Sequence, residues 1–178
     1  MTMSKPAAPK PVKLIVSLIT RDTSVFAAVA GKLSQAYGGM DFVSKYIPFD
    51  KTDYYEMEMG KHLMRRLMTF EPLMAPDGLP EVKHATDRLE AEYEDEKGHR
   101  TVNLDPGYIA LSHLILATNK QFYHRPYLRD GVYADPTLVY KRKSFQSLEW
   151  TFPDYGSDEI IEIMNRLRER YRVQLRGM

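Results

Sequence analysis

Five acidic or amide side chains could supply the oxygen ligands of a metal site. They are Asp50, Asp53, Asn103, Asp105 and Asp154. Asn103 and Asp105 stand two residues apart at the end of a predicted strand, so their side chains share one face. Hard cations such as Mg²⁺ prefer oxygen ligands, and a bound cation can activate water for hydrolysis. If these side chains converge, the sequence predicts a magnesium-assisted hydrolase.

The same acidic residues also have structural explanations. Asp53 and Glu56 match a capping box for a short helix that Gly60 would end. The segment 105–108, Asp-Pro-Gly-Tyr, has the residues of a type II turn. Asp154 follows a proline and is also typical of a turn. Metal ligands and turn residues therefore remain alternative interpretations of this group.

A basic and aromatic group is the best candidate for binding an anion. Its members are His124, Arg125, Arg129, Tyr127, Tyr108 and Tyr155. The arginine fork matches phosphate or carboxylate, and histidine exchanges protons near neutral pH. The alternative is a set of cross-strand pairs on an exposed sheet face. As an exposed strand residue, Arg125 is expected to contribute little to stability.

Other sequence motifs narrow the choice of chemistry. The twelve tyrosines and nearby arginines could stack the bases of RNA, but no RNP-type string is present. The chain contains no phosphate-binding P-loop, nucleophile elbow or dinucleotide fingerprint. The dipeptide Asn119-Lys120 resembles part of a guanine-reading motif, but Gln121-Phe122 follows where an aspartate is required. Because there is no cysteine and no H-x-x-x-H pair, we do not expect a zinc site.

Length and composition favour one domain without disulfides. The chain has 178 residues and a net charge of +1, so no overall field favours nucleic acid or a membrane. No apolar segment approaches the ~20 residues of a membrane helix, and the N-terminus lacks the apolar core of a signal peptide. We expect a cytoplasmic protein with a flexible Pro/Lys-rich leader at 1–11 and a single α+β domain at 12–178.

Hydrophobic periodicity predicts alternating strands and helices. Strands are expected at 12–19, 41–48, 63–70, 102–104, 111–118, 124–128, 132–140 and 144–150, and helices after residues 22, 53, 80 and 157. Asp130-Gly131 predicts a hairpin, and Pro136 requires an edge or bulge position. The order over 12–104 is that of a ferredoxin-like split β-α-β unit. An antiparallel meander and a C-terminal helix extend it.

Six segments of the chain have a distinctive sequence. They are 13–22, 48–60, 102–108, 117–120, 124–125 and 150–155, and they read KLIVSLITRD, PFDKTDYYEMEMG, VNLDPGY, ATNK, HR and WTFPDY. Through these segments, nearly all of residues 12–175 resemble an uncharacterised bacterial family catalogued only as a domain of unknown function. The resemblance implies a single-domain protein and supplies no catalytic residue or cofactor.

Three hypotheses on function follow from the residues. The first is a binding module for a phosphate-bearing ligand, either a nucleotide or RNA. The second is the metal-assisted hydrolase, and the third is a protein-interaction module. The first two require that the loops bearing Asp50, Asp105, Arg125 and Asp154 gather at one rim of the sheet.

Overall fold

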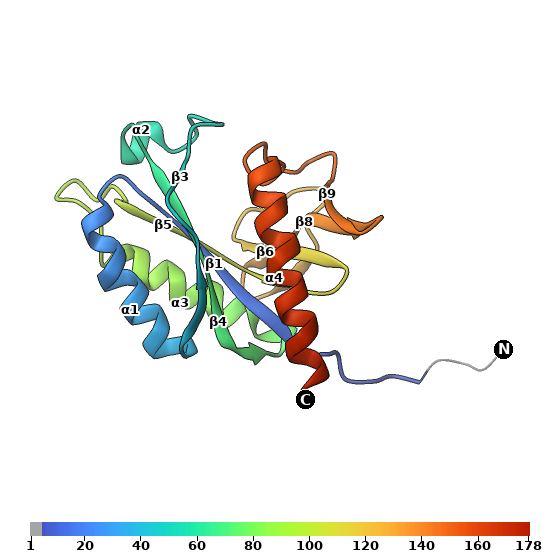
Figure 1. Cartoon of the computed structure of the whole chain (residues 1–178). Helices are drawn as coiled ribbons and strands as arrows, with labels where there is room; N and C mark the ends of the chain where they lie inside the picture. The colour runs from blue at the N-terminus through green and yellow to red at the C-terminus, as the bar shows by residue number, and fades with distance from the viewer. Residues whose placement is uncertain (1–4) are drawn as a thin grey trace.

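The computed structural model describes residues 5–178 as a mixed α and β protein (Figure 1). Residues 1–4 of the expected leader lie outside the described part. Within it, nine strands are β1 (Val12–Thr20), β2 (Met40–Val43), β3 (Ile47–Pro48), β4 (Met64–Met74), β5 (Val102–Ile109), β6 (His113–Thr118), β7 (Tyr127–Arg129), β8 (Val132–Lys141) and β9 (Ser144–Ser147). The helices are α1 (Phe26–Tyr37), α2 (Glu56–Met59), α3 (Leu79–Ala91) and α4 (Asp158–Arg176), with 3₁₀ turns at Thr23–Val25 and Pro76–Gly78.

All strands join one antiparallel sheet. The order of neighbours is β2-β4-β1-β5-β6-β8-β7, while β3 adds to β4 and β9 adds to β8. β1 is buried along its whole length because it lies between β4 and β5 and is covered on both faces. This explains its near-continuous run of apolar residues.

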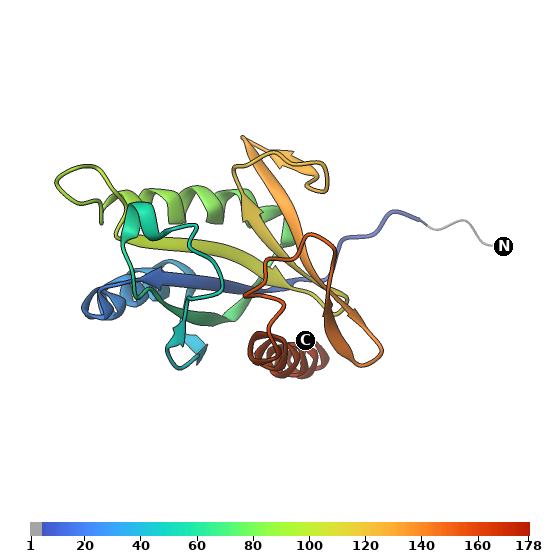
Figure 2. The same cartoon turned by 90° about the horizontal axis from the view of Figure 1, so that it is seen from above.

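Helices cover the two faces of the sheet unequally. Leu14, Val16 and Leu18 of β1 pack with α1 and α3. Ile15, which points to the opposite face, packs with α4. Figure 2 shows α3 and α4 on opposite sides of the strands. α4 also reaches β8 and β9 through Leu138 and Phe145, so it spans both halves of the sheet.

The two halves of the sheet meet at a short junction. β5 and β6 pair only from Gly107↔Leu116 to Ile109↔Leu114, and beyond it β6 and β8 turn away from β5 (Figure 2). A Cβ on Gly107 would lie 2.3 Å from the carbonyl oxygen of Ile115. The expected type II turn at 105–108 is therefore wrong. The segment continues β5, and its glycine permits the close approach of β6.

Most other local predictions are confirmed. The helices α1 and α3 and the hairpin at Asp130-Gly131 are present. The strands β7, β8 and β9 pair in chain order, but β7 and β9 both lie on the edge of β8 that faces away from β6, so they do not form the expected three-strand meander. Pro136 lies at a register shift between β6 and β8, as its missing N–H requires. Ser157 caps α4 by accepting a hydrogen bond from the Ile160 amide. Two further predictions differ: the strand at 41–48 is interrupted, and the start of α2 has no side-chain cap at Tyr55, so the capping box is not formed.

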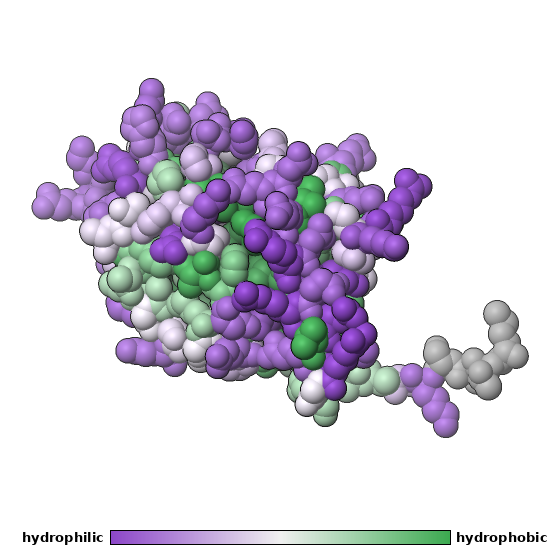
Figure 3. Space-filling view, viewed as in Figure 1, coloured by the Kyte–Doolittle hydropathy of each residue, from purple (hydrophilic) through white to green (hydrophobic). Residues whose placement is uncertain are grey.

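Surface hydrophobicity is concentrated in the middle of one face. In the view of Figure 3, hydrophobic residues gather there between hydrophilic rims. Within residues 5–178, no helix combines the length and the apolar character needed to cross a membrane.

Candidate functional site

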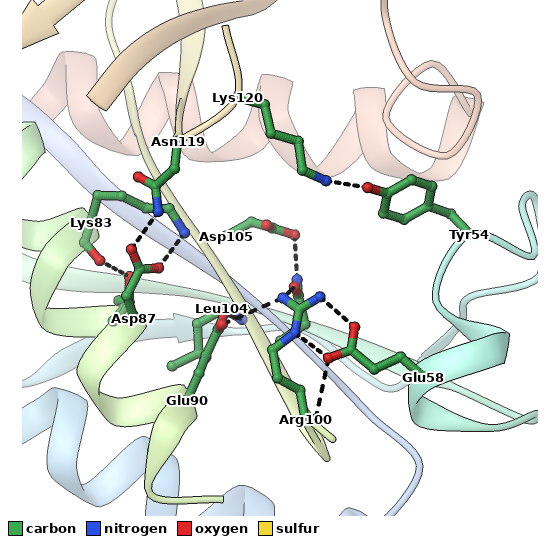
Figure 4. Close-up of polar contacts among 12 residues, drawn as sticks. Tyr54, Glu58, Lys83, Asp87, Glu90, Arg100, Leu104, Asp105, Asn119 and Lys120 are labelled. Carbon is green, nitrogen blue, oxygen red and sulfur yellow. Dashed lines mark hydrogen bonds and ion pairs between the residues drawn. The ribbon is translucent and has the colours of Figure 1, made fainter. Parts of the chain in front are cut away.

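The end of β5 that β6 leaves unpaired carries a group of charged residues, which we call the charged cluster (Figure 4). Its members are Glu58, Lys83, Asp87, Glu90, Arg100, Asn103, Asp105, Asn119 and Lys120. They come from α2, from α3, from β5 with the loop before it, and from the loop after β6. The cluster therefore assembles from four separate parts of the chain.

α3 supplies one side of the charged cluster. Lys83, Asp87 and Glu90 are spaced by four and three residues, so they form one stripe of the helix. Lys83 Nζ donates to Asp87 Oδ1 at 2.6 Å, and Asn119 Nδ2 donates to Asp87 Oδ2 at 2.7 Å. The Leu104 amide on the open edge of β5 donates to Glu90 Oε1 at 2.5 Å. The helix thus closes a strand edge that would otherwise lack a partner.

Arg100 and β5 supply the opposite side. Arg100 Nε and Nη2 donate to the two carboxylate oxygens of Glu58 at 2.8 and 2.7 Å. Arg100 Nη1 donates to Asn103 Oδ1 at 3.0 Å, and Asn103 Nδ2 donates to Asp105 Oδ2 at 2.9 Å. Figure 4 places Asp105 between these residues and the Lys83–Asp87 pair. The carboxylate of Asp105 therefore lies near the centre of the cluster.

Burial changes the protonation of two carboxyl groups in the cluster. It raises the pKa of Glu90 to about 7, against the opposing effects of the Leu104 amide, Lys83 and Arg100. Burial also raises the pKa of Asp105, although Arg65, Lys83 and Asn103 oppose the shift. Glu90 can therefore accept a proton near neutral pH. Carboxyl groups with such shifts are common at functional sites.

A buried ion pair lies behind Asp105 on the same face of the sheet. Arg65 is 3% exposed, and its Nη2 lies 2.5 Å from Asp154 Oδ2. The guanidinium carbon lies 4.9 Å from the Phe49 ring centroid and 4.7 Å from that of Tyr155. The Arg65 charge also opposes the rise in the pKa of Asp105. Arg65 thus links the loops that contain Phe49 and Asp154 to the charged cluster.

Exposed aromatic rings lie on the loops that contribute to the cluster. Tyr54, Phe122 and Tyr123 are 60%, 55% and 74% exposed. Lys120 Nζ donates to the Tyr54 hydroxyl and lies 4.6 Å from the centroid of that ring. Tyr123 lies edge-on to Trp150, the only tryptophan of the chain, at 6.2 Å between centroids. Aromatic surface beside a lysine is suited to stacking a planar group next to an anion.

The arginine expected to bind an anion is already paired. Arg125 Nε and Nη2 lie 2.9 and 2.8 Å from Asp135 Oδ2, and its side chain is only 10% exposed. His124 is buried, stacks on Trp150 at 4.6 Å, and lies 3.6 Å from Asp135. The expectation that Arg125 is an exposed strand residue is therefore wrong: it lies before β7. Asp135 occupies the fork that was expected to bind a ligand.

The other predicted ligand residues are divided between the β7–β8 hairpin and two buried regions. Arg129 pairs with Glu81 and Asp130 at the β7–β8 hairpin and lines a cavity of about 420 Å³ near the start of β1. Tyr127, on the same hairpin, is 59% exposed. Tyr108 packs against a core cluster around Leu79. Tyr155 is buried, and its ring packs against the guanidinium group of Arg65.

The predicted metal ligands converge only in part. Asn103 and Asp105 are hydrogen-bonded neighbours, and the charge of Asp154 reaches Asp105. Asp50 and Asp53 lie in the exposed segment before α2. Across the described range 5–178, no three carboxylate or imidazole side chains are grouped so that they could hold one metal ion. The five residues therefore do not form a single ring of ligands.

Sequence reasoning missed the basic and acidic residues of α3 and the buried Arg65. The i, i+4, i+7 spacing of Lys83, Asp87 and Glu90 was the available signal, since it places three charges on one stripe beside the apolar one. Asn119 and Lys120 were noted only for their likeness to a guanine-reading motif. Nothing local to Arg65 distinguishes it from an exposed strand residue.

Comparison with known proteins identifies a family and no activity. The model of the family described as "Domain of unknown function (DUF4416)" matches residues 10–171. No curated protein and no solved structure matches the chain. The match covers almost the whole described chain, including every residue of the charged cluster. The chain therefore belongs to the DUF4416 family.

Proposed function

We propose that the protein binds a phosphate-bearing ligand of the nucleotide class at the charged cluster. The observation that carries the proposal is that Lys83, Arg100 and Lys120, which come from three separate segments, border the same region around Asp105 (Figure 4). Cations in such a region can bind a phosphate group. The rings of Tyr54, Phe122 and Tyr123 provide exposed faces on which a base can stack.

An anionic ligand would have to replace the present partners of the cations in the cluster. These partners are Asp87 for Lys83, Glu58 for Arg100 and the Tyr54 hydroxyl for Lys120. Glu90 can become neutral near pH 7 because burial raises the pKa of its carboxyl group to about 7. An incoming phosphate would therefore be accompanied by proton uptake, and its binding is expected to be stronger at pH 6 than at pH 8.

Fluorescence of Trp150 offers a direct binding assay, since the ring of exposed Tyr123 is a neighbour of both the Trp150 ring and the exposed Phe122 ring. AMP, GMP, ATP, inorganic phosphate and a short single-stranded RNA are titrated separately, and affinities are checked by calorimetry. We expect a nucleotide to bind and Lys120→Ala to weaken it at least tenfold, because a charge-assisted hydrogen bond contributes about 1.5–3 kcal/mol. Preferential binding of RNA over mononucleotides would identify the polymer as the ligand.

Lys61→Ala is the matched control, because Lys61 is an exposed lysine just after α2 that contributes nothing to the cluster. Equal nucleotide affinity in the wild type, Lys120→Ala and Lys61→Ala would refute the proposed site. Absence of binding by every phosphate compound would refute the proposed function.

Acid–base catalysis on the bound ligand is a second candidate, and the pKa of Glu90 favours it. A carboxyl group with a pKa of about 7 can both take and give a proton at neutral pH. Release of phosphate from nucleotides, measured with and without Mg²⁺ and with Glu90→Gln, separates hydrolysis from binding alone. Under this hypothesis Glu90→Gln abolishes release and leaves nucleotide affinity within a few-fold of the wild type.

We also propose that β1, α1, β2, β4, α3 and β5 form a ferredoxin-like split β-α-β unit. The antiparallel order β2-β4-β1-β5 and the packing of α1 and α3 on one face support this assignment. The strands β7–β9 and α4 would then be additions to that unit. An experimental structure compared with ferredoxin-like proteins would test the assignment.

A further inference from the structure

The cavity of about 420 Å³ near the start of β1 is a groove with apolar walls and a charged rim. The apolar side chains come from β1, the end of α1, β4 and α3, and they include Leu14, Tyr37, Pro72 and Val82. The exposed charged side chains at the rim are Asp77, Glu81 and Arg129. None of these residues belongs to the charged cluster, so the groove can be tested separately from the proposed nucleotide site.

The rim of the groove has an excess of negative charge. Two carboxylates, Asp77 and Glu81, oppose the single guanidinium group of Arg129. Glu81 already pairs with Arg129, whereas no ion pair within the described residues 5–178 involves Asp77. A partner that fits this groove therefore combines apolar side chains with a positive charge.

The chain itself contains a segment with this chemistry, residues 5–11, which we call the leader segment. It reads KPAAPKP, so Pro6 and Pro9 form a P-x-x-P pattern beside Lys5 and Lys10. Such segments are pre-organised as polyproline II helices and dock in grooves with aromatic and apolar walls. The residues of the leader segment up to Lys10 are exposed, so their side chains can contact a partner.

The leader segment leaves the domain on the side opposite the groove. The Tyr171 hydroxyl of α4 donates to the Pro11 carbonyl oxygen at 2.7 Å. α4 covers one face of the sheet, whereas Leu14 and Val82 of the groove belong to the face covered by α1 and α3. Pro9 and Pro11 hold themselves and the residue before each in extended conformations, which disfavours a reversal of the chain there. The leader segment therefore runs away from its own groove (Figure 1).

We propose that the leader segment of one copy docks in the groove of a second copy, so that the chain self-associates. The two lysines of the segment lie near Asp77, and its two prolines pack on Tyr37 and Pro72. In the polyproline II conformation the segment spans about 20 Å. Because the contact is small, the association is weak and depends on protein concentration.

Sedimentation velocity of the full chain at increasing concentration measures this self-association. Asp77→Lys and the double variant Lys5→Glu with Lys10→Glu each place like charges in contact, so each should weaken self-association by at least about tenfold. Glu96→Lys is the matched control, because Glu96 is an exposed acid in the loop after α3 and does not line the groove. This variant should self-associate like the wild type. Circular dichroism checks that every variant is folded.

An equimolar mixture of the Asp77→Lys chain and the double variant distinguishes docking between copies from docking within one chain. Each leader segment in the mixture can meet a groove of opposite charge on the other chain, so association should return to within a few-fold of the wild type. Docking within one chain predicts no such recovery.

Four results overturn the proposal. They are a wild type that is monomeric at every concentration, equal self-association of Asp77→Lys and Glu96→Lys, equal self-association of the double variant and Glu96→Lys, and no recovery in the mixture. A synthetic peptide with the sequence of residues 5–12 is also titrated into the full chain and followed by amide NMR. Shifts at the groove in a chain that stays monomeric would assign the groove to a proline-rich segment of another protein, and would likewise overturn docking of a second copy.

Discussion

Gly107→Ala tests whether the close approach of β5 and β6 holds the two halves of the sheet together. An added methyl group at residue 107 would meet the Ile115 carbonyl oxygen at 2.3 Å, Leu116 Cδ2 at 2.7 Å and Leu116 Cα at 3.1 Å. Two of these atoms belong to the backbone of β6. They can move only if the strand moves, and Gly107 is one of the few β5 residues that pair with β6.

The expected loss of stability is about 3 kcal/mol, the upper end of the usual range for overpacking, because backbone atoms cannot rotate away. For a chain of this length, that loss lowers Tm by roughly 6–12 °C. Gly31→Ala is the matched control. Gly31 lies within α1 with no atom within 4 Å of the added Cβ, so its replacement should raise stability by about 0.5–1 kcal/mol.

Urea denaturation followed by circular dichroism, together with thermal melting, measures both variants against the wild type. A Gly107→Ala variant whose free energy of unfolding falls within about 0.5 kcal/mol of the wild type, the usual range for a neutral surface change, would refute the reasoning. Such a result would mean that β5 and β6 can accommodate a methyl group at residue 107, so that Gly107 would not be required for their pairing.

Glu90→Gln keeps an acceptor for the Leu104 amide but removes the carboxyl group whose pKa is raised from 4.5 to about 7. The unfolded chain releases this proton at a lower pH than the folded one, so the wild type loses stability as pH rises from 4.5 to 7. The stability of the variant relative to the wild type should therefore increase over that range by at most about 3 kcal/mol, measured by urea denaturation at several pH values; a constant difference contradicts the shift. Arg125→Ala should lower the free energy of unfolding by roughly 3–5 kcal/mol, because it leaves Asp135 buried without its main partner. Arg129→Ala, an exposed control on the hairpin, should leave the free energy of unfolding close to that of the wild type, and equal effects of the two variants would contradict the buried pairing.

Local patterns predicted those elements that depend on neighbours in sequence. The apolar run of β1, the stripe of α1 and the turn at Asp130-Gly131 each contain their own signal. The segment Asp105-Pro-Gly107 was wrongly predicted to form a turn because it has the composition of one. Its glycine instead allows β6, the next strand along the chain, to lie close to β5. Tertiary packing determined the outcome there, as it often does in strands.

The candidate site depends on contacts that no local pattern contains. Glu58 and Arg100 are 42 residues apart, and Lys120 and Tyr54 are 66 apart. The sequence suggested that the Arg125 guanidinium group was available for a ligand, because no local pattern identifies Asp135, ten residues later, as its partner. The predicted rim included Asp105 and Asp154, but the cations of this region come from β4, from α3 and from the loops before β5 and after β6.

The junction between β5 and β6 also has a mechanical consequence. A ladder of three residue pairs is a weak seam between two sub-sheets, each of which has far more extensive internal pairing. α4 crosses this seam, with Ile15 and Leu67 on one side of it and Leu138 and Phe145 on the other. We therefore expect α4 to hold the two sub-sheets together, so that they unfold in one cooperative step.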